Sequence, residues 1–397
     1  MPNLHFTTAG ESHGRALVAI LEGIPAGLAL EAAHVDADLR RRMAGYGRGA
    51  RMKIESDAAE LLAGIRAGET LGSPIAMLIW NRDWENWIDI MNPAPDADPD
   101  AKRRRRVTRP RPGHADLVGV LKYGRRDARD ILERASARET AARVACGAVC
   151  RRLLAEFGVE IGSHVVELGP IRAPEITDPP TPLNEAADRS LVRCLDSTTS
   201  DAMVQAIDAA VKARDTLGGV AEVFVRGLPV GLGSHVSWER KLDARLARAV
   251  MSIPAVKGME IGMGFEAARR RGSEVHDEIV RGAEGFTRKS NRAGGLEGGM
   301  TTGEPLVIRA AMKPISTLRR PLGTVDIGTG ADAKAQSERS DVTAVPAMGV
   351  IAEAMTALVL ADAFLEKFGG DSMRELRANY EAYREGLRVR WSEMGEA

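Results

Sequence analysis

Two histidines and several arginines lie in glycine- and proline-rich segments, where side chains are poorly placed for core packing. The first segment is Thr8–Gly14, in which His13 stands between Ser12 and Gly14. Histidine changes charge near neutral pH and can act as a general acid. A histidine in a tight loop can equally serve as a hydrogen-bonding turn residue, so this segment alone leaves both interpretations open.

Two further segments have the same character. In Arg109–Asp116, prolines fix an extended backbone and present Arg111 and His114 with little loss of entropy on binding. In Asn291–Gly299, two Gly-Gly pairs flank Glu297, which suits a backbone that must pass against a planar or phosphorylated ligand. An ordinary glycine-rich turn would give the same pattern, so this third segment is the weakest signal.

Other cationic and hydroxyl side chains recur along the chain. Each one, considered alone, is either surface charge or a ligand contact. Together with the two histidines they indicate an enzyme that binds an anion and carries out acid–base chemistry. They are Arg42 and Arg48 beside a glycine-rich turn, Arg134–Glu139, Lys313–Thr317 after a predicted strand, and Arg339–Asp341 before a predicted helix.

A mixed α and β scaffold must hold these segments. Apolar residues at three- and four-residue spacing predict helices, and short β-rich stretches alternate with them. The predicted helices are 127–157, 201–213 and 346–368, and the predicted strands are 162–168, 220–226 and 305–312. The last helix is apolar on nearly every side, so we expect it to be deeply buried. The predicted helices and strands do not alternate in regular βαβ units along the chain, which predicts an α+β fold in one domain.

The composition is that of an ordinary soluble protein with balanced charge. The 397 residues include 55 Lys+Arg and 55 Asp+Glu, and the pI is near 7.1. This balance argues against a protein whose whole surface binds nucleic acid or membrane. Arginine outnumbers lysine 45 to 10, which favours an anionic ligand, although a genomic bias toward arginine would give the same count.

Several classes of site and location are disfavoured. No Gly-Lys dipeptide occurs, so there is no phosphate-binding P-loop, and the seven histidines do not cluster in sequence, so we expect no metal. The three cysteines, Cys146, Cys150 and Cys194, cannot form a disulfide framework and indicate a reducing compartment. No signal peptide is visible and no apolar run reaches the ~18 residues of a membrane span, so we expect a cytoplasmic protein.

Seven ordered blocks of the sequence resemble those of the chorismate synthase family. The resemblance covers about residues 4–370, which is almost the whole chain, so a chance match is not a serious competitor. The blocks are Thr8–Gly14, Arg109–Asp116, Glu133–Thr140, Gly272–Glu278, Asn291–Thr302, Met312–Thr317 and Arg339–Asp341 with Ala344–Pro346 behind it.

The resemblance implies a fold, an activity and a cofactor. The fold would be a single-domain β-α-β sandwich over residues 1–370, assembled as a homotetramer. Residues 371–397, which are the part least like the family, are expected to form a charged helical extension. The activity would be anti-1,4-elimination of phosphate from 5-enolpyruvylshikimate 3-phosphate, which gives chorismate in the last step of the shikimate pathway toward aromatic amino acids. The family requires reduced FMN although the reaction has no net redox change. The anionic substrate would account for the excess of arginine.

Roles for individual residues follow from the resemblance as well. His13 matches the acid for the departing phosphate, His114 the histidine that protonates or hydrogen-bonds to the reduced flavin, and Asp341 the carboxylate that helps flavin N5 act as base. Arg42 and Arg48 match contacts to the substrate or to an NADPH phosphate. The positions that match FMN contacts are Arg134, Ala135, Ser136, Pro254, Ala255, Gly298, Lys313, Pro314, Ile315, Ser316, Thr317 and Arg339.

Two features depart from the family pattern. Pro254 stands where an amide side chain is usual, so only its carbonyl or its ring could contact FMN. The run Lys102–Arg106 is more basic than we expect of the family, and it either steers the anionic substrate or is simply solvated.

Two other functions compete with this interpretation. One is a bifunctional synthase that reduces its own FMN with NADPH. No clear nucleotide-binding fold supports it, so we expect NADPH to act only indirectly, by supplying reduced flavin. The other is an arginine-rich nucleic-acid binder that uses residues 102–111, a run that lacks aromatic side chains for base stacking. We therefore expect neither nucleic acid nor membrane as a partner.

Overall fold

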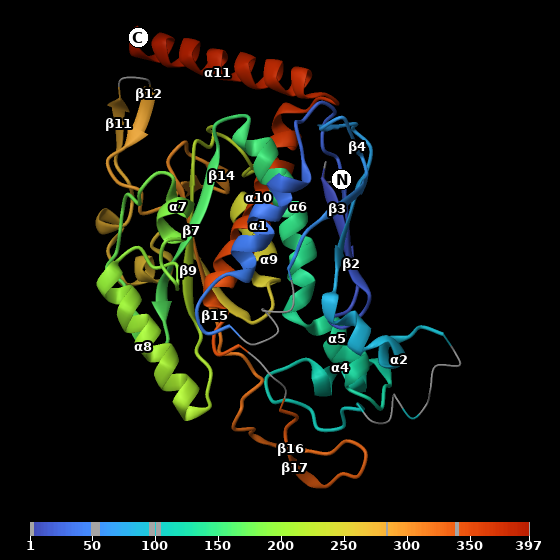
Figure 1. Ribbon diagram of the computed structural model, residues 1–397. Helices are drawn as coiled ribbons and strands as arrows, with labels where there is room; N and C mark the ends of the chain where they lie inside the picture. The colour runs from blue at the N-terminus through green and yellow to red at the C-terminus, as the bar shows by residue number, and fades with distance from the viewer. Residues whose placement is uncertain are drawn as a thin grey trace.

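Two antiparallel sheets enclose a layer of helices (Figure 1). The computed structural model describes residues 4–48, 56–94, 100, 105–282, 285–337 and 341–396. The first sheet has the strand order β1-β2-β6-β3, formed by His5–Ala9, Ala16–Glu22, Ile75–Trp80 and Glu60–Ala63. The second has the order β10-β15-β9-β7-β8, formed by Val256–Ile261, Leu306–Met312, Gly219–Arg226, Glu160–Leu168 and Ile171–Arg172. This arrangement confirms the α+β class.

Four short hairpins complete the strands of the described residues. They are β4 and β5 (Ile65–Arg66, Glu69–Thr70), β11 and β12 (Ile279–Gly282, Gly285–Arg288), β13 and β14 (Leu296–Glu297, Met300–Thr301), and β16 and β17 (Gly323–Val325, Asp332–Lys334).

Helices form the middle layer and cover the ends of the sandwich. Helices α1, α6 and α10 pack on one another between the sheets, and α11 lies across the end of the molecule (Figure 1). The α-helices are α1 Ala32–Met43, α2 Ile88–Met91, α4 Asp116–Tyr123, α5 Arg129–Ala135, α6 Thr140–Ala155, α7 Leu183–Ala187, α8 Ser197–Ala213, α9 Leu242–Met251, α10 Val345–Phe368 and α11 Met373–Glu396. The 3₁₀ helices are η2 Arg82–Asn86, η3 Ala137–Glu139, η4 Trp238–Arg240, η5 Gly264–Arg269 and η6 Gly272–Glu274.

Helix α10 is the core of the molecule, as its apolar sequence predicts. It is long and apolar enough to cross a membrane, but 89% of its most apolar window is buried inside the fold. Helix α6 crosses it closely, because a Cβ added at Gly147 would lie 2.4 Å from the Cβ of Ala354. A larger residue at Gly147 would push the two helices apart, and packed interiors tolerate that poorly.

The predicted strands and two of the three predicted helices are confirmed, with ends shifted by a few residues. The prediction of one helix over 127–157 is wrong. Ser136 has an extended backbone (φ −65°, ψ 142°), and its hydroxyl accepts a hydrogen bond from the N–H of Arg138. Serine competes with helical hydrogen bonding in this way. The break separates α5 from α6 and places the end of α5 beside the β1–β2 turn.

The helix layer contains a buried carboxylate with arginine partners from several elements. Glu353 of α10 is fully buried and accepts hydrogen bonds from Arg41 of α1 at 2.8 and 2.9 Å. It also accepts from Arg151 of α6 at 2.5 Å, from Arg193 at 3.2 Å and from the hydroxyl of Ser163 in β7. Burial alone would raise the pKa of Glu353, but the three arginines hold it well below its usual range. This ion cluster ties α1, α6 and β7 to the core helix.

Replacing Glu353 with glutamine should destabilise the protein by about 2–4 kcal/mol, because three arginines lose the buried carboxylate that they share and keep, among the described residues, only Asp38 and Asp188 as counter-charges. Urea denaturation at pH 7 measures the loss. The pKa of Glu353 is lower in the folded state than its ordinary value of about 4.5. The ionised carboxylate therefore stabilises the fold at pH values above about 4.5, and this stabilisation is lost as the pH falls further. The difference in free energy of unfolding between wild type and Glu353→Gln should become smaller in acid. A loss no larger than that of the exposed Glu366→Gln would contradict this account.

Candidate active site

The turn between β1 and β2 carries His13, and α5 supplies its partner. The Nδ1 atom of His13 lies 3.0 and 2.8 Å from the two carboxylate oxygens of Glu133. The backbone N–H of His13 donates to the same carboxylate at 3.0 Å, and the N–H of Ser12 donates to the Glu133 carbonyl at 2.9 Å. These contacts fix the imidazole and the turn that carries it against α5.

An indole ring covers one side of His13. The rings of His13 and Trp87 stack with their centroids 3.9 Å apart and their planes at 24°. The indole N–H donates to Asp83 at 3.0 Å, and the same carboxylate oxygen lies 3.9 Å from Nε2 of His13. The guanidinium groups of Arg105 and Arg129 lie 4.2 and 4.9 Å from the centre of the Trp87 ring. The imidazole is therefore held by stacking as well as by hydrogen bonds.

Glu133 is ionised although it is buried, with a side chain only 2% exposed. Burial alone would raise the pKa of Glu133, but hydrogen bonds and charge from His13 and Arg129 lower it. Arg129 donates to this carboxylate at 2.8 Å. An ionised carboxylate can only accept hydrogen bonds, so it holds a proton on Nδ1 and turns the other ring nitrogen, Nε2, away from itself.

A second histidine is held by a second buried carboxylate. Nδ1 of His114 lies 2.6 Å from Asp116, the first residue of α4, which is completely buried. The guanidinium of Arg111 donates to Asp116 at 2.8 and 3.1 Å and to the hydroxyl of Thr317 at 2.9 Å. Burial would raise the pKa of Asp116, but hydrogen bonds from His114 and Arg111 hold it well below its usual range. The His114 segment is therefore ordered internally and joined to the residues that follow β15.

The segment Lys313–Thr317 follows β15 and has the chemistry of a phosphate site. Lys313 donates its ammonium to the Gly113 carbonyl at 2.8 Å and its backbone N–H to the Ala255 carbonyl at 2.9 Å. Burial and the nearby charge of Lys257 lower the pKa of Lys313. In the part of the chain that the structure describes, neither lysine forms an ion pair with a carboxylate. Two adjacent ammonium groups beside the hydroxyls of this segment fit a phosphorylated cofactor.

Arg42 and Arg48 follow each other closely in sequence but have different surroundings. Nε of Arg48 lies 3.3 Å from a carboxylate oxygen of Asp341. Arg42 is buried, and burial lowers its pKa to about 10, which leaves it charged at neutral pH. Its guanidinium donates to three protein groups: the hydroxyl of Thr140 (3.0 Å), the carbonyl of Ala137 (2.9 Å) and Asp57 (3.4 Å). Arg42 thus supports the start of α6, whereas Arg48 orients Asp341.

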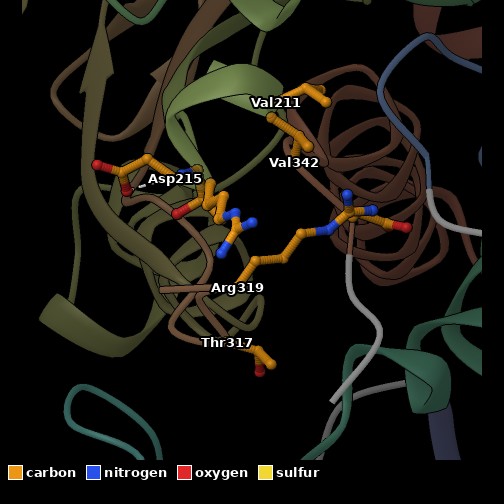
Figure 2. Close-up of a pocket in the computed structure, with 8 residues that line it drawn as sticks. Val211, Asp215, Thr317, Arg319 and Val342 are labelled. Carbon is orange, nitrogen blue, oxygen red and sulfur yellow. Dashed lines mark hydrogen bonds between the residues drawn. The ribbon is translucent and has the colours of Figure 1, made fainter. Parts of the chain in front are cut away.

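A surface pocket connects Asp341 with the end of the Lys313–Thr317 segment (Figure 2). Val211 and Val342 lie on one side of it, Thr317 lies on the other, and Arg319 extends between them. The residues that line the pocket are Val211, Arg214, Asp215, Thr216, Thr317, Arg319, Asp341 and Val342. Two of the predicted site positions, far apart in sequence, therefore share one concave surface.

The residues that precede the Ser136 break lie next to the His13 turn. Arg134 donates to the carbonyls of Gly10 and Thr8 at 3.1 and 2.9 Å, so Ala135 and Ser136 follow directly beside this turn. Within the described chain, the structure thus groups the predicted positions into two neighbourhoods, one around His13 and one around His114 and Lys313.

Gly298 is not brought near these neighbourhoods within one chain. It lies in the β13–β14 hairpin, next to the start of α9, whereas Pro254 and Ala255 follow the end of α9. A helix of ten residues is about 15 Å long. Arg339 lies outside the described residues.

Sequence reasoning missed the side chains that hold the two histidines. Glu133 and Asp116 stand inside the recognised blocks, but neither was given a role. The four-residue spacing of Glu133 from Arg129 is the one local signal, since such pairs meet on a helix. Asp83 and Trp87 lie in and just after a 3₁₀ helix without glycine or motif, and no local pattern marks them.

Comparison with known proteins identifies relatives along the whole chain. The family model described as chorismate synthase matches residues 4–365. The chorismate synthase of Thermobifida fusca (strain YX) is 57% identical over 98% of this chain and 100% of its own, and that of Desulforudis audaxviator (strain MP104C) is 58% identical over 97% and 98%. A solved structure described as a crystal structure of chorismate synthase is 45% identical, covers 97% of this chain and 98% of its own, and superposes with a TM-score of 0.78.

Replacing Asp116 with asparagine should cost about 2–3 kcal/mol of folding free energy, because the buried charge of Arg111 loses its carboxylate. Urea denaturation at pH 7 measures this, with the exposed Asp130→Asn as control, for which a loss of about 0–1 kcal/mol is expected. Since the folded-state pKa of Asp116 is lowered, the difference should shrink as the pH falls below about 4. Equal losses for the two variants would show that the Arg111–Asp116–His114 contact is not a structural unit.

Proposed function

Because this chain belongs to the chorismate synthase family, whose members are carbon–oxygen lyases acting on phosphates, we propose that it converts 5-enolpyruvylshikimate 3-phosphate to chorismate and inorganic phosphate by anti-1,4-elimination. The observation that carries this proposal is the pair of histidines, each in contact with a buried carboxylate, among arginines from distant segments. A substrate with a phosphate and two carboxylates needs cationic partners, and a departing phosphate needs a proton donor. The reaction would complete the shikimate pathway toward aromatic amino acids.

His13 is the acid in this proposal. Its proton passes to the phosphate as the allylic C–O bond breaks, so the negative charge that develops on the leaving group is neutralised. Arg134, which is anchored on the same turn, adds positive charge beside it. Arg42 uses its donors on protein groups, so in this proposal it supports the site rather than contacting the anionic ligand.

Reduced FMN is the cofactor in this proposal, and the donor set around Lys313 supports it. Its holding residues would be Arg134–Ser136, Ala255 and Lys313–Thr317, with Pro254 able to offer only its carbonyl or ring. When bound, reduced flavin supplies electron density to the breaking allylic C–O bond and regains it. Asp341 provides a proton acceptor at the pocket, and His114 provides a ring nitrogen whose orientation Asp116 fixes.

We further propose a cytoplasmic homotetramer with neither nucleic acid nor membrane as a partner. The outer side of the first sheet exposes Ile20 and Trp80, which are 36% and 44% accessible, and apolar surface of this kind is typical of subunit contacts. Arg111, in the basic segment 102–111, is buried and pairs with Asp116. Its guanidinium is therefore not available to a nucleic-acid phosphate. The three cysteines are buried and free, as suits a reducing compartment.

The purified chain, incubated without oxygen with the substrate and dithionite-reduced FMN, should release chorismate and phosphate in equal amounts. Oxidised FMN should give neither product. NADPH in place of dithionite should also give none unless a separate flavin reductase is added, and product without one would establish the bifunctional alternative. Folded chain that binds FMN yet yields no product under reducing conditions would refute the proposal.

His13→Gln should lower kcat by about 10²–10⁴-fold, the usual contribution of a general acid, while FMN binding stays unchanged. His5→Gln is the matched control, because His5 is exposed on β1, the strand that leads into the same turn. Anaerobic stopped-flow turnover and an FMN titration measure the two effects. A variant at His13 with the wild-type kcat would exclude its role as the acid.

A further inference from the structure

Glu133 has no role in the elimination described above, yet it makes the closest contacts to His13. Its carboxylate accepts hydrogen bonds from three donors: Nδ1 of His13, the backbone N–H of His13 and the guanidinium of Arg129. One carboxylate oxygen accepts a hydrogen bond from Arg129 and the other accepts from the backbone N–H of His13. Nδ1 of His13 lies within 3.0 Å of both oxygens. A buried carboxylate with these three hydrogen bonds has little freedom to move away from the imidazole.

We propose that Glu133 is a positioning residue that holds a proton on Nδ1 of His13 and so makes Nε2 the atom from which the proton leaves. The inference rests on the proposed function, since it takes His13 as the acid. It deepens that function by assigning the state and the orientation of the acid to one side chain on a different element, α5.

The assignment follows from the chemistry of the imidazole. The carboxylate can only accept, so the proton on Nδ1 stays with Nδ1 whether the ring is charged or neutral. The transferable proton of the charged ring is then the one on Nε2. During the reaction the Nε2–H bond breaks, an O–H bond forms on the phosphate, and the electron pair of the broken N–H bond remains on Nε2. The ring ends neutral with its proton on Nδ1, and Glu133 stays ionised throughout.

The other charged groups near the ring do not duplicate this contact. Among the described residues, Asp83 lies 3.9 Å from Nε2, and its two oxygens accept hydrogen bonds from the Trp87 indole and the Asn86 amide. Arg129 and Arg105 lie over the Trp87 ring and, as guanidinium groups, offer no acceptor to the imidazole. Glu11 stands on the same turn, with its carboxylate directed at Gly14. Among the described residues, Glu133 is thus the acceptor that contacts Nδ1.

Glu133→Gln tests this without turnover. The side chain keeps its shape, but the carboxylate that accepts from Nδ1 is gone. In the ligand-free chain labelled with ¹⁵N in the histidine rings, NMR of the neutral His13 ring should show the proton on Nδ1 in wild type and a larger share of it on Nε2 in the variant. The His13 signal is assigned by its disappearance in His13→Gln. Glu133→Asp should restore the wild-type tautomer in part, and Asp83→Asn should leave it in place.

The kinetic arm measures kcat and KM separately. For Glu133→Gln kcat should fall about 10²-fold or more while KM changes little, because the acid is misplaced but the substrate still binds. Glu139→Gln is the structural control, because Glu139 is buried and pairs with Arg143 four residues on, as Glu133 pairs with Arg129. It should leave the His13 tautomer in place even if it costs similar stability.

The two arms separate the failure of this inference from the failure of the proposed function. An unchanged His13 tautomer in Glu133→Gln, or a change equal to that of Glu139→Gln, would overturn the positioning role whatever the chain catalyses. A changed tautomer in Glu133→Gln, together with a wild-type chain that releases no chorismate, would uphold the Glu133–His13 coupling and refute the function on which the inference rests.

Discussion

A carboxylate that leaves water must gain hydrogen-bonded cations, or its burial costs more free energy than a fold can supply. The helix layer meets this constraint at Glu353, which three arginines surround. The end of the sandwich meets it at Glu133 and Asp116, which each hold an arginine and a histidine. Glu353 draws its arginines, and Glu133 its histidine, from distant segments, whereas the partners of Asp116 lie within five residues of it. Both histidines are therefore oriented before a ligand arrives, which is the preorganisation that acid–base catalysis requires.

Arginine is the common partner in these clusters because its planar fork can satisfy two acceptors at once. The excess of arginine in the composition therefore has two uses. Some guanidinium groups, such as those of Arg41 and Arg42, are committed to protein acceptors inside the fold. Others, such as Arg48 and Arg319, lie near the pocket and its carboxylate. The anionic substrate alone does not account for the first group, since burial of acidic residues already demands it.

Local patterns in the sequence predicted the scaffold well and the site in part. Helix α10 and the strands of the second sheet follow from apolar runs and spacing, which are local properties. The break at Ser136 does not, because the apolar spacing continues across it while the serine hydroxyl accepts from the backbone of Arg138. His13 was predicted, but its partner Glu133 lies 120 residues away, and only the fold brings the two together. Glu133 and Asp116 stand inside the motif blocks, but the sequence alone does not show that they orient the histidines.

The most direct test of the account is a crystal structure of the full-length chain with oxidised FMN and 5-enolpyruvylshikimate 3-phosphate, in which no turnover occurs. The account predicts the substrate phosphate within hydrogen-bonding distance of Nε2 of His13, with Nδ1 still against Glu133, and the FMN phosphate near Lys313. A phosphate bound away from His13, or an imidazole that has left Glu133 to reach it, would contradict the claim that the fold prepares the acid in advance.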